Sequence, residues 1–128
     1  MADGKAEVTI ERTADEVWAL VGRFEGLDEW MPGIESCEME GDVRKLHMMG
    51  MEVHEQLHER DDAARRISYS IVKSPMPLEH HRATISVIPE GDGARLEWLY
   101  EVRPDEMAAA FGPAYEGSAQ AVKKRLEG

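Results

Sequence analysis

The sequence predicts an α+β domain in which a curved antiparallel sheet of about six or seven strands packs around a long C-terminal helix. Three observations support this fold. One alternating segment and a short helical segment open the chain, several alternating segments separated by turn residues follow, and the last part carries an apolar stripe at helical spacing. The 128 residues suit one hydrophobic core, so we expect a single domain spanning 1-128.

The N-terminal part predicts a strand followed by two short helices. Residues 6–13 alternate between apolar and polar positions, as expected for a strand. Thr13-Ala14-Asp15-Glu16 has the spacing of a capping box, and apolar residues continue at helical spacing to Phe24. A second helical turn is expected over 26–30, and it ends before Pro32 because the residue preceding a proline avoids helical angles.

The middle of the chain predicts an antiparallel meander. Glycine- and aspartate-containing turns separate its alternating segments, and the two prolines of 73–77 make that stretch a loop. The strands are expected over residues 34–39, 43–48, 52–59, 65–72, 80–88 and 94–102.

The C-terminal part predicts one long helix that covers the sheet. Pro104 and Asp105 are typical of a helix start. Gly112-Pro113 is expected to kink or break the helix, because proline removes a hydrogen-bond donor. The apolar stripe consists of Met107, Phe111, Tyr115, Ser118, Val122 and Leu126.

Composition excludes several classes of function. A net charge of −11 opposes binding to nucleic-acid phosphates and to anionic membrane surfaces. No run approaches the ~20 apolar residues of a membrane helix, so we expect no stable membrane insertion. A single cysteine, Cys37, and no signal-like N-terminus favour a cytoplasmic location.

Two polar residues occupy core-facing positions in the predicted sheet. Glu55 shares a strand face with Val53 and Leu57. His81 shares another with three small or branched residues, Ala83, Ile85 and Val87. We expect Glu55 and His81 to face a common apolar pocket under the last helix. Alternatively, Glu55 is a carboxylate satisfied by the backbone or by a neighbour such as Arg66, and His81 is a satisfied core histidine.

Several segments resemble small bacterial members of the polyketide cyclase/dehydrase and lipid-transport superfamily (SRPBCC), which has the helix-grip fold of START domains and of the birch-pollen allergen. Residues 7–24 resemble its opening strand and helix, and 30–37 its lead-in to the second strand. Further matches are Glu55-Gln56-Leu57, Asp61-Asp62, the run 65–71, Pro75-Met76-Pro77-Leu78 and 93–98.

The resemblance implies a deep, largely apolar pocket between sheet and C-terminal helix. Members carry lipids, steroids, hormones or polyketides, and some catalyse cyclisation or dehydration. In the abscisic acid receptors of this superfamily, the counterpart of Glu55 helps to bind the polar end of the ligand, and the counterpart of His81 is a pocket tyrosine. The receptors' gate loop is shortened here to 49–51, so hormone-receptor function is not carried over. The family also places the counterpart of Glu97 near the pocket, whereas alternation with its neighbours favours the opposite face.

Three functions are compatible with these patterns. The first is binding of a mainly apolar polyketide, isoprenoid or lipid-like molecule, with Glu55 and His81 orienting its polar end. The second is a cyclase or dehydratase in which these two residues form a general acid/base pair. The third is an interaction module whose pocket is filled by its own side chains. The further ligand-binding candidates are Val53, Tyr69, Ile71, Ala83, Glu97, Trp30, Phe111, Tyr115, Ser118 and Val122.

No sequence motif indicates a metal or a cofactor. The five histidines lack metal-binding spacing, although His47 and His54 flank a predicted hairpin and could be cross-strand neighbours. No Gly-x-Gly-x-x-Gly or Gly-x-Ser-x-Gly pattern occurs. We therefore expect the only partner to be a small apolar ligand or substrate, and the protein to be a monomer or homodimer.

Overall fold

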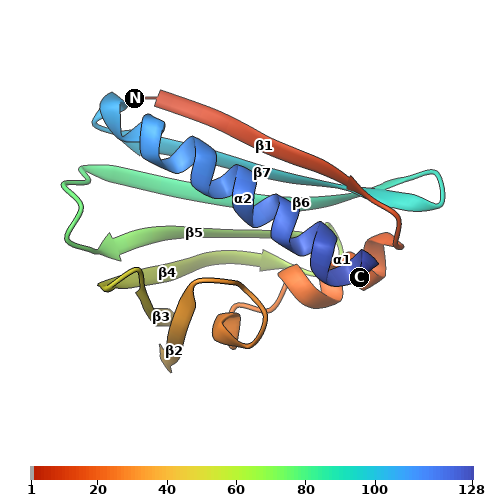
Figure 1. Ribbon diagram of the computed structural model, residues 1–128, viewed down its shortest axis with the longest axis horizontal. Coiled ribbons are helices and arrows are strands. Elements are labelled where there is room, and N and C mark those ends of the chain that lie inside the picture. Colours follow the sequence, from red (N-terminus) through yellow and green to blue (C-terminus); the bar gives the residue numbers. More distant parts are fainter. Residues whose placement is uncertain (1) are drawn as a thin grey trace.

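Seven antiparallel strands form one curved sheet, and a long helix packs on its concave face (Figure 1). The computed structural model describes residues 2–128. The strand order is β1-β7-β6-β5-β4-β3-β2. The strands are β1 (Ala2–Ile10), β2 (Ile34–Glu40), β3 (Val43–Met48), β4 (Met51–Asp61), β5 (Arg66–Lys73), β6 (His80–Glu90) and β7 (Gly93–Arg103). This arrangement confirms the predicted helix-grip fold.

Two short helices connect β1 to β2, as predicted. They are the α-helix α1 (Ala14–Val21) and the 3-10 turn η1 (Leu27–Glu29). Thr13 caps α1: its hydroxyl accepts the Glu16 N–H at 3.2 Å, and the Glu16 carboxylate accepts the Thr13 N–H at 3.3 Å. The capping box therefore satisfies two backbone donors at the start of the helix.

The first strand differs from its prediction. It begins at Ala2 and ends at Ile10 rather than spanning 6–13, and it pairs with β7 along its whole length. Its inward-facing residues near the N-terminus are small, so they gave no apolar alternation. One of them, Gly4, lies beneath Tyr100, where a Cβ atom would overlap the tyrosine ring.

The sequence predicted a kink or a break at Gly112-Pro113, and the break is wrong because the C-terminal helix is continuous there. A 3-10 turn, η2 (Asp105–Met107), leads into α2 (Ala108–Glu127), which contains Pro113. Pro113 and Ala109, whose carbonyl the proline cannot pair, are both exposed, so water can satisfy that carbonyl. Gly112 lets the helix pass close to the Tyr100 hydroxyl, which lies 3.1 Å from where a Cβ would be.

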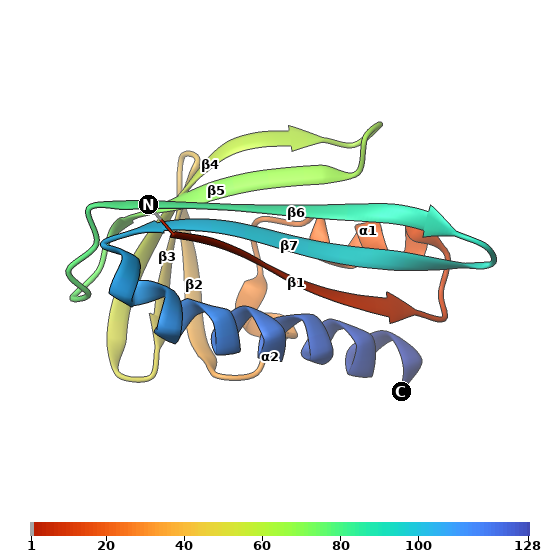
Figure 2. The same cartoon turned by 90° about the horizontal axis from the view of Figure 1, so that it is seen from above.

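The core has a large and a small part. The large part lies between the sheet and the two helices α1 and α2, while the small one consists of Leu27, Leu46 and Val53. Seen from above, β2 and β3 extend past the plane of β6 and β7 toward the side where α2 lies (Figure 2). Three partly buried residues pack against both parts: Trp30, Met31 and Ile71. The junction of the two parts is where the candidate site lies.

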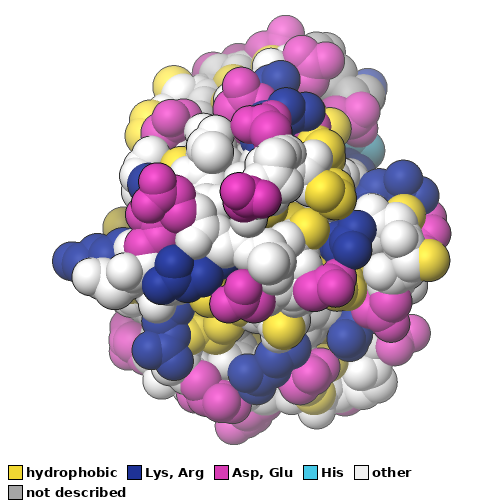
Figure 3. Space-filling view, turned by 90° about the vertical axis from the view of Figure 1, so that its right-hand side faces the viewer, with side chains coloured by type: hydrophobic (Ala, Val, Ile, Leu, Met, Phe, Trp, Pro, Cys, Tyr) yellow, Lys and Arg dark blue, Asp and Glu magenta, His cyan; other side chains and the backbone are white. Residues whose placement is uncertain are grey.

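The charged surface shows no large area of one sign on the face of Figure 3, where acidic and basic side chains are interspersed. The excess of 26 acidic over 15 basic residues is therefore not gathered into one patch on this face. None of the helices within residues 2–128 combines the length and the apolar character that crossing a membrane requires.

Candidate functional site

A partly open pocket of about 120 Å³, the internal cavity, lies between the sheet, the η1–β2 segment and α2. Its wall combines apolar and aromatic side chains with the buried ion pair of Arg44 and Glu55 and with Arg23. The lining residues are Val21, Arg23, Leu27, Trp30, Met31, Pro32, Ile34, Arg44, Leu46, Met48, Glu55, Tyr69, Ile85, Trp98, Tyr115 and Ser118. The predicted pocket between sheet and C-terminal helix therefore exists, but it is small.

Glu55 forms a buried ion pair with Arg44. The two residues face each other across β3 and β4, and the Nε and Nη2 atoms of Arg44 each lie 2.7 Å from Glu55 Oε1. Arg44 Nη1 also donates to the Phe24 carbonyl at 3.0 Å. The guanidinium carbon also lies near two rings, 4.2 Å from the Phe24 centroid and 4.9 Å from that of Tyr69. This arrangement satisfies a charge that would otherwise be costly to bury.

The ion pair keeps Arg44 charged. Burial alone disfavours the charged guanidinium, but the Glu55 carboxylate outweighs burial and raises the pKa of Arg44 above its ordinary value. Oε1 of Glu55 accepts both Arg44 donors, and Oε2 has no hydrogen-bond partner among residues 2–128. Glu55 is also one of the residues that line the cavity.

His81 is buried and fully hydrogen-bonded, and it does not line the cavity. Its Nδ1 accepts the backbone N–H of Ile71 at 3.0 Å, so the neutral ring carries its proton on Nε2. That Nε2–H donates to the Tyr115 hydroxyl at 2.7 Å. Burial, followed by the charge of His80, lowers the pKa of His81 to about 4, so the ring is neutral at physiological pH.

Two tyrosines connect His81 to the cavity wall. Tyr115 is hydrogen-bonded to Tyr69, whose hydroxyl also accepts the Trp98 indole N–H at 3.2 Å. Both hydroxyls are buried, and burial raises the pKa of Tyr69 and of Tyr115, so both stay protonated. Tyr69 and Tyr115 line the cavity with their rings, and neither is an ionisable base at neutral pH.

The structure brings five of the predicted site residues to the cavity: Trp30, Glu55, Tyr69, Tyr115 and Ser118. The remaining inward-facing candidates belong to the surrounding core and do not line the cavity, namely Val53, Ile71, Ala83, Phe111 and Val122. Glu97 lies on the opposite face of the sheet, where its carboxylate accepts from Arg95 Nε at 3.1 Å. Strand alternation was therefore the better guide to Glu97 than the family resemblance.

Sequence reasoning missed Arg44 and named Arg66 as a partner for Glu55. Arg66 instead binds Glu59 on the outer surface, at 2.9 Å. Two sequence signals could have identified Arg44. It alternates with Leu46 on the apolar face of its strand, and the Met49-Gly50 turn pairs it with Glu55. The sequence also did not single out Arg23, which lines the cavity and pairs with Glu29 at 3.4 Å. The remaining lining residues that were not singled out are apolar or aromatic.

His47 and His54 are not directly paired across the hairpin, since His47 lies opposite Glu52 and His54 opposite Lys45. Glu52 lies beside both His47 and His54 at the β3–β4 hairpin, and Lys73 is also within 3.7 Å of its carboxylate. Within residues 2–128, no group of three or more histidine, cysteine, aspartate or glutamate side chains is arranged to hold a metal ion.

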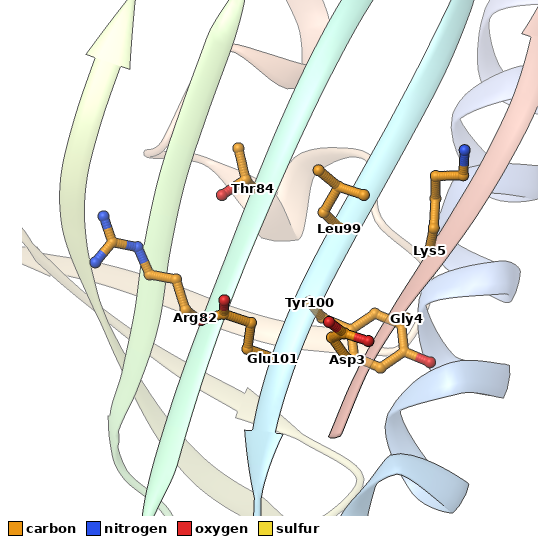
Figure 4. A pocket seen from close by; sticks show the side chains of 8 residues that line it. All are labelled: Asp3, Gly4, Lys5, Arg82, Thr84, Leu99, Tyr100 and Glu101. Atoms are coloured by element: carbon orange, nitrogen blue, oxygen red, sulfur yellow. The ribbon is translucent and has the colours of Figure 1, made fainter. Parts of the chain in front are cut away.

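A second, open hollow of about 530 Å³ lies on the outer face of the sheet. Figure 4 shows side chains from β1, β6 and β7 around it, including Lys5, Arg82, Thr84, Leu99 and Glu101. None of the predicted site residues belongs to it. The sheet separates it from the internal cavity, so a substitution in this hollow is a suitable control in binding experiments.

The fold and the internal cavity define a helix-grip domain whose pocket combines an apolar wall with a buried ion pair. The family described as polyketide cyclase / dehydrase and lipid transport matches residues 1–127, and the chain belongs to this family. No curated protein matches the chain significantly.

Solved structures show the same fold. The protein XoxI from Bacillus cereus is 29% identical, has a TM-score of 0.90, and the match covers 97% of this chain and 94% of that one. A START superfamily protein from Mycobacterium smegmatis is 20% identical, with a TM-score of 0.79 and coverage of 98% and 97%. BexL, a di-domain ARO/CYC protein of the BE-7585A biosynthetic pathway, is 20% identical with a TM-score of 0.84. That match covers 99% of this chain and 47% of BexL.

Proposed function

We propose that the protein binds a mainly apolar small molecule in the cavity between the sheet and α2. The observation that carries this proposal is the cavity itself, an internal space with a largely apolar wall and a few fixed polar groups. Ligand sites in proteins commonly have this composition. The family also includes lipid-transport and polyketide-processing proteins by its description, which supports an apolar ligand.

The volume of the cavity limits the size of the ligand that it can hold. At about 120 Å³ it is smaller than the ~300–1,000 Å³ of typical ligand pockets, and it is close to the size that accommodates one aromatic ring. A complete polyketide, isoprenoid or lipid would need additional space. Trp30 and Pro32 could provide it, because they also line an outer groove of about 530 Å³ along α2. Outward movement of this segment would join the groove to the cavity.

Binding is favoured over proton transfer by the state of the two polar residues. A general base needs a free lone pair at the substrate, yet both ring nitrogens of His81 are used by Ile71 and Tyr115. Glu55 lines the cavity, but two nitrogens of Arg44 already occupy its Oε1. The pair therefore supports anchoring of a ligand better than acid–base catalysis by Glu55 and His81 together.

Native mass spectrometry of the protein purified from its own host tests this proposal. We expect a co-purified small molecule bound to the folded wild-type chain. Ser118→Leu, which places a larger side chain in the cavity, should abolish the adduct. Leu99→Gln, in the outer hollow, is the matched control and should retain it.

Two results would contradict cavity binding. One is an adduct that survives Ser118→Leu and disappears in Leu99→Gln, because the ligand would then lie on the outer face. The other is a wild-type protein that carries no adduct and whose cavity resonances do not shift when toluene, a small apolar probe, is added in an NMR titration.

A further inference from the structure

The outer face of the sheet carries two pairs in which a serine hydroxyl lies within hydrogen-bond distance of a histidine ring. Ser70 Oγ on β5 lies 2.6 Å from His58 Nε2 on β4, and Ser36 Oγ on β2 lies 3.1 Å from His47 Nδ1 on β3. Neither pair lines the internal cavity. A serine becomes a nucleophile when an adjacent imidazole can accept its proton. The surroundings of the two pairs differ, and the difference singles out Ser70.

A β-bulge places His58 beside Ser70. The register of β4 against β5 shifts between Leu57 and Glu59, so His58 is an extra residue in β4. Bulges redirect side chains and are frequent beside active sites. Ser70 is half-buried and His58 is exposed. The sheet therefore holds the pair in place, and a molecule in solution can reach it.

His58 can accept a proton at neutral pH. Burial, followed by the charge of Arg82, lowers the pKa of His58, so the neutral ring predominates at pH 7. When the ring proton is on Nδ1, the lone pair of Nε2 accepts the Ser70 O–H. Nδ1 itself has no hydrogen-bond partner within residues 2–128. The pair therefore lacks the third residue that orients the histidine of a complete triad, and we expect slower catalysis than a triad gives.

Arg82 supplies a positive charge beside the pair. Its side chain extends from β6 across β5 (Figure 4), where Nε donates to Ser68 Oγ at 2.6 Å. Ser68 and Ser70 lie two residues apart on the same face of β5. Arg82 forms no ion pair within residues 2–128, and its two Nη atoms have no acceptor there. These N–H groups can stabilise the negative oxygen that develops when an ester is attacked.

Two neighbouring carboxylates are engaged by other residues. Glu101 lies opposite Arg82 in the register of β6 and β7, but its carboxylate lies 3.3 Å from His80 Nε2. Glu59 follows the bulge in β4, and its carboxylate accepts from Arg66 at 2.9 Å. Neither carboxylate therefore forms an ion pair with Arg82.

The pair of Ser36 and His47 has different surroundings. His47 Nε2 lies 3.6 Å from the Glu52 carboxylate, which also pairs with Lys73 at 3.7 Å. This pair therefore has a carboxylate where Ser70 has an unpaired arginine. A carboxylate disfavours a developing oxyanion, so Ser36 is the matched reference for Ser70.

We propose that the outer face of the sheet hydrolyses small carboxylic esters, with Ser70 as nucleophile, His58 as general base and Arg82 as the group that stabilises the oxyanion. Ser70 Oγ attacks the ester carbonyl carbon while His58 Nε2 takes the hydroxyl proton. The bond to the alcohol breaks, the alcohol leaves with that proton, and the acyl group stays on Ser70. A water molecule then attacks the acyl group and gives a proton to His58. Release of the carboxylic acid returns this proton to Ser70 Oγ.

The rest of the ester has space beside the pair. Arg82 is one of the residues that line the outer hollow of about 530 Å³, whose wall also includes the half-exposed Leu99. This activity would be independent of ligand binding in the internal cavity, because the sheet lies between the two sites.

Hydrolysis of 4-nitrophenyl acetate by the full chain tests the inference. Peptide mass spectra after a rapid acid quench should show an acetyl group on Ser70. Ser70→Ala should reduce the rate to that of the buffer, and His58→Gln should reduce it about 10²–10⁴-fold. Arg82→Gln should reduce it at least about tenfold. The wild-type rate should fall as the pH drops below 6.5, because protonated His58 cannot accept the hydroxyl proton.

Two variants are the matched controls. Ser36→Ala removes the serine of the other serine–histidine pair. Arg103→Gln removes an exposed arginine that, like Arg82, forms no ion pair within residues 2–128. Each should leave the rate within about twofold of wild type.

Three results would overturn the inference. The first is a Ser70→Ala variant as active as wild type, and the second is acetylation confined to lysines or to other serines. The third is an equal effect of Arg82→Gln and Arg103→Gln, which would remove the assigned role of Arg82. None of these results bears on ligand binding in the cavity, because Ser70, His58 and Arg82 lie outside its wall.

Discussion

The protein contains two buried polar clusters that differ in how completely their hydrogen bonds are formed. Around His81, each ring nitrogen has a partner, and the Tyr115 and Tyr69 hydroxyls continue the network to Trp98. Around Arg44 and Glu55, the ion pair is formed, but a carboxylate oxygen is open and the nearby Trp30 N–H has no partner. We call the network around His81 the closed cluster and the group around Arg44 and Glu55 the open cluster. A complete hydrogen-bond network stabilises a core, whereas an incomplete one beside a cavity is where a ligand is expected.

The largest expected effect comes from breaking the ion pair. Glu55→Leu or Arg44→Met should each destabilise the protein by about 3–5 kcal/mol, because each leaves the partner's charge buried and unpaired. The double variant should lose much less than the sum of the two, since no unpaired charge remains. Urea unfolding of the four proteins at pH 7 measures this cycle.

Additive losses in the cycle would show that the two charges do not depend on each other. The exposed pair formed by Arg66 and Glu59 is the matched reference, because both of its side chains are more than 40% exposed. Breaking it with Glu59→Gln should cost no more than about 1 kcal/mol.

The closed cluster should show a pH dependence of stability that comes from His81. The folded-state pKa of His81 is about 4, against 6.5 for an unperturbed histidine. Between pH 6.5 and 4 the unfolded chain binds a proton at this position that the folded chain does not. Stability from this group is therefore complete above pH 6.5 and is lost as the pH falls toward 4, by about 3 kcal/mol in total.

Comparing wild type with His81→Gln isolates this contribution, since all other acid-sensitive groups are common to both proteins. Unfolding free energies measured from pH 7 to pH 4 should converge as the pH falls. Parallel profiles would mean that His81 titrates normally in the folded state, and the buried network would then need revision.

A single hydroxyl in the closed cluster should have a smaller effect. Tyr115→Phe keeps the ring packing but leaves His81 Nε2–H without an acceptor, so we expect a loss of about 1–3 kcal/mol in chemical denaturation. Tyr100→Phe is the control, because the Tyr100 hydroxyl makes no hydrogen bond within residues 2–128, and it should change stability by less than about 0.5 kcal/mol. Equal losses in the two variants would contradict a special role for the hydroxyl of Tyr115.

The sequence was sufficient for the fold and for the faces of most strands. Alternation placed Glu55 and His81 inside, and it placed Glu97 outside against the family resemblance. Arg44 could also have been predicted as the partner of Glu55, because a two-residue turn at Met49-Gly50 places the two residues opposite each other.

The part that could not be predicted depends on contacts between distant segments. The β5–β6 pairing ends at Tyr69 and Ala83, so the Ile71 N–H lies beyond the ladder and is taken by the His81 ring. That hydrogen bond holds the His81 ring in the core and away from the cavity. The volume of the cavity likewise results from side chains of η1, β3, β4, β7 and α2 packed together, which no local pattern reports.

The smallest expected change in stability comes from a substitution in the cavity wall. It allows the most direct comparison of the cavity wall with the filled core. Ser118 and Ala119 are neighbours on α2, but Ser118 lines the cavity while Ala119 is 1% exposed in the closed core. Ser118→Leu should leave stability within about 1 kcal/mol of wild type, because the added methyl groups enter empty apolar space. Ala119→Leu should cost about 1–3 kcal/mol or more, because the same enlargement meets filled space.

Unfolding free energies of the two variants, measured side by side, decide whether the cavity is truly unfilled. If Ser118→Leu is as damaging as Ala119→Leu, the space beside Ser118 is already occupied by shifted side chains. The third function considered from the sequence, a domain whose pocket is filled by its own residues, would then be favoured. If Ser118→Leu is tolerated and ligand binding is lost, the open cluster is the binding site and the closed cluster is its structural support.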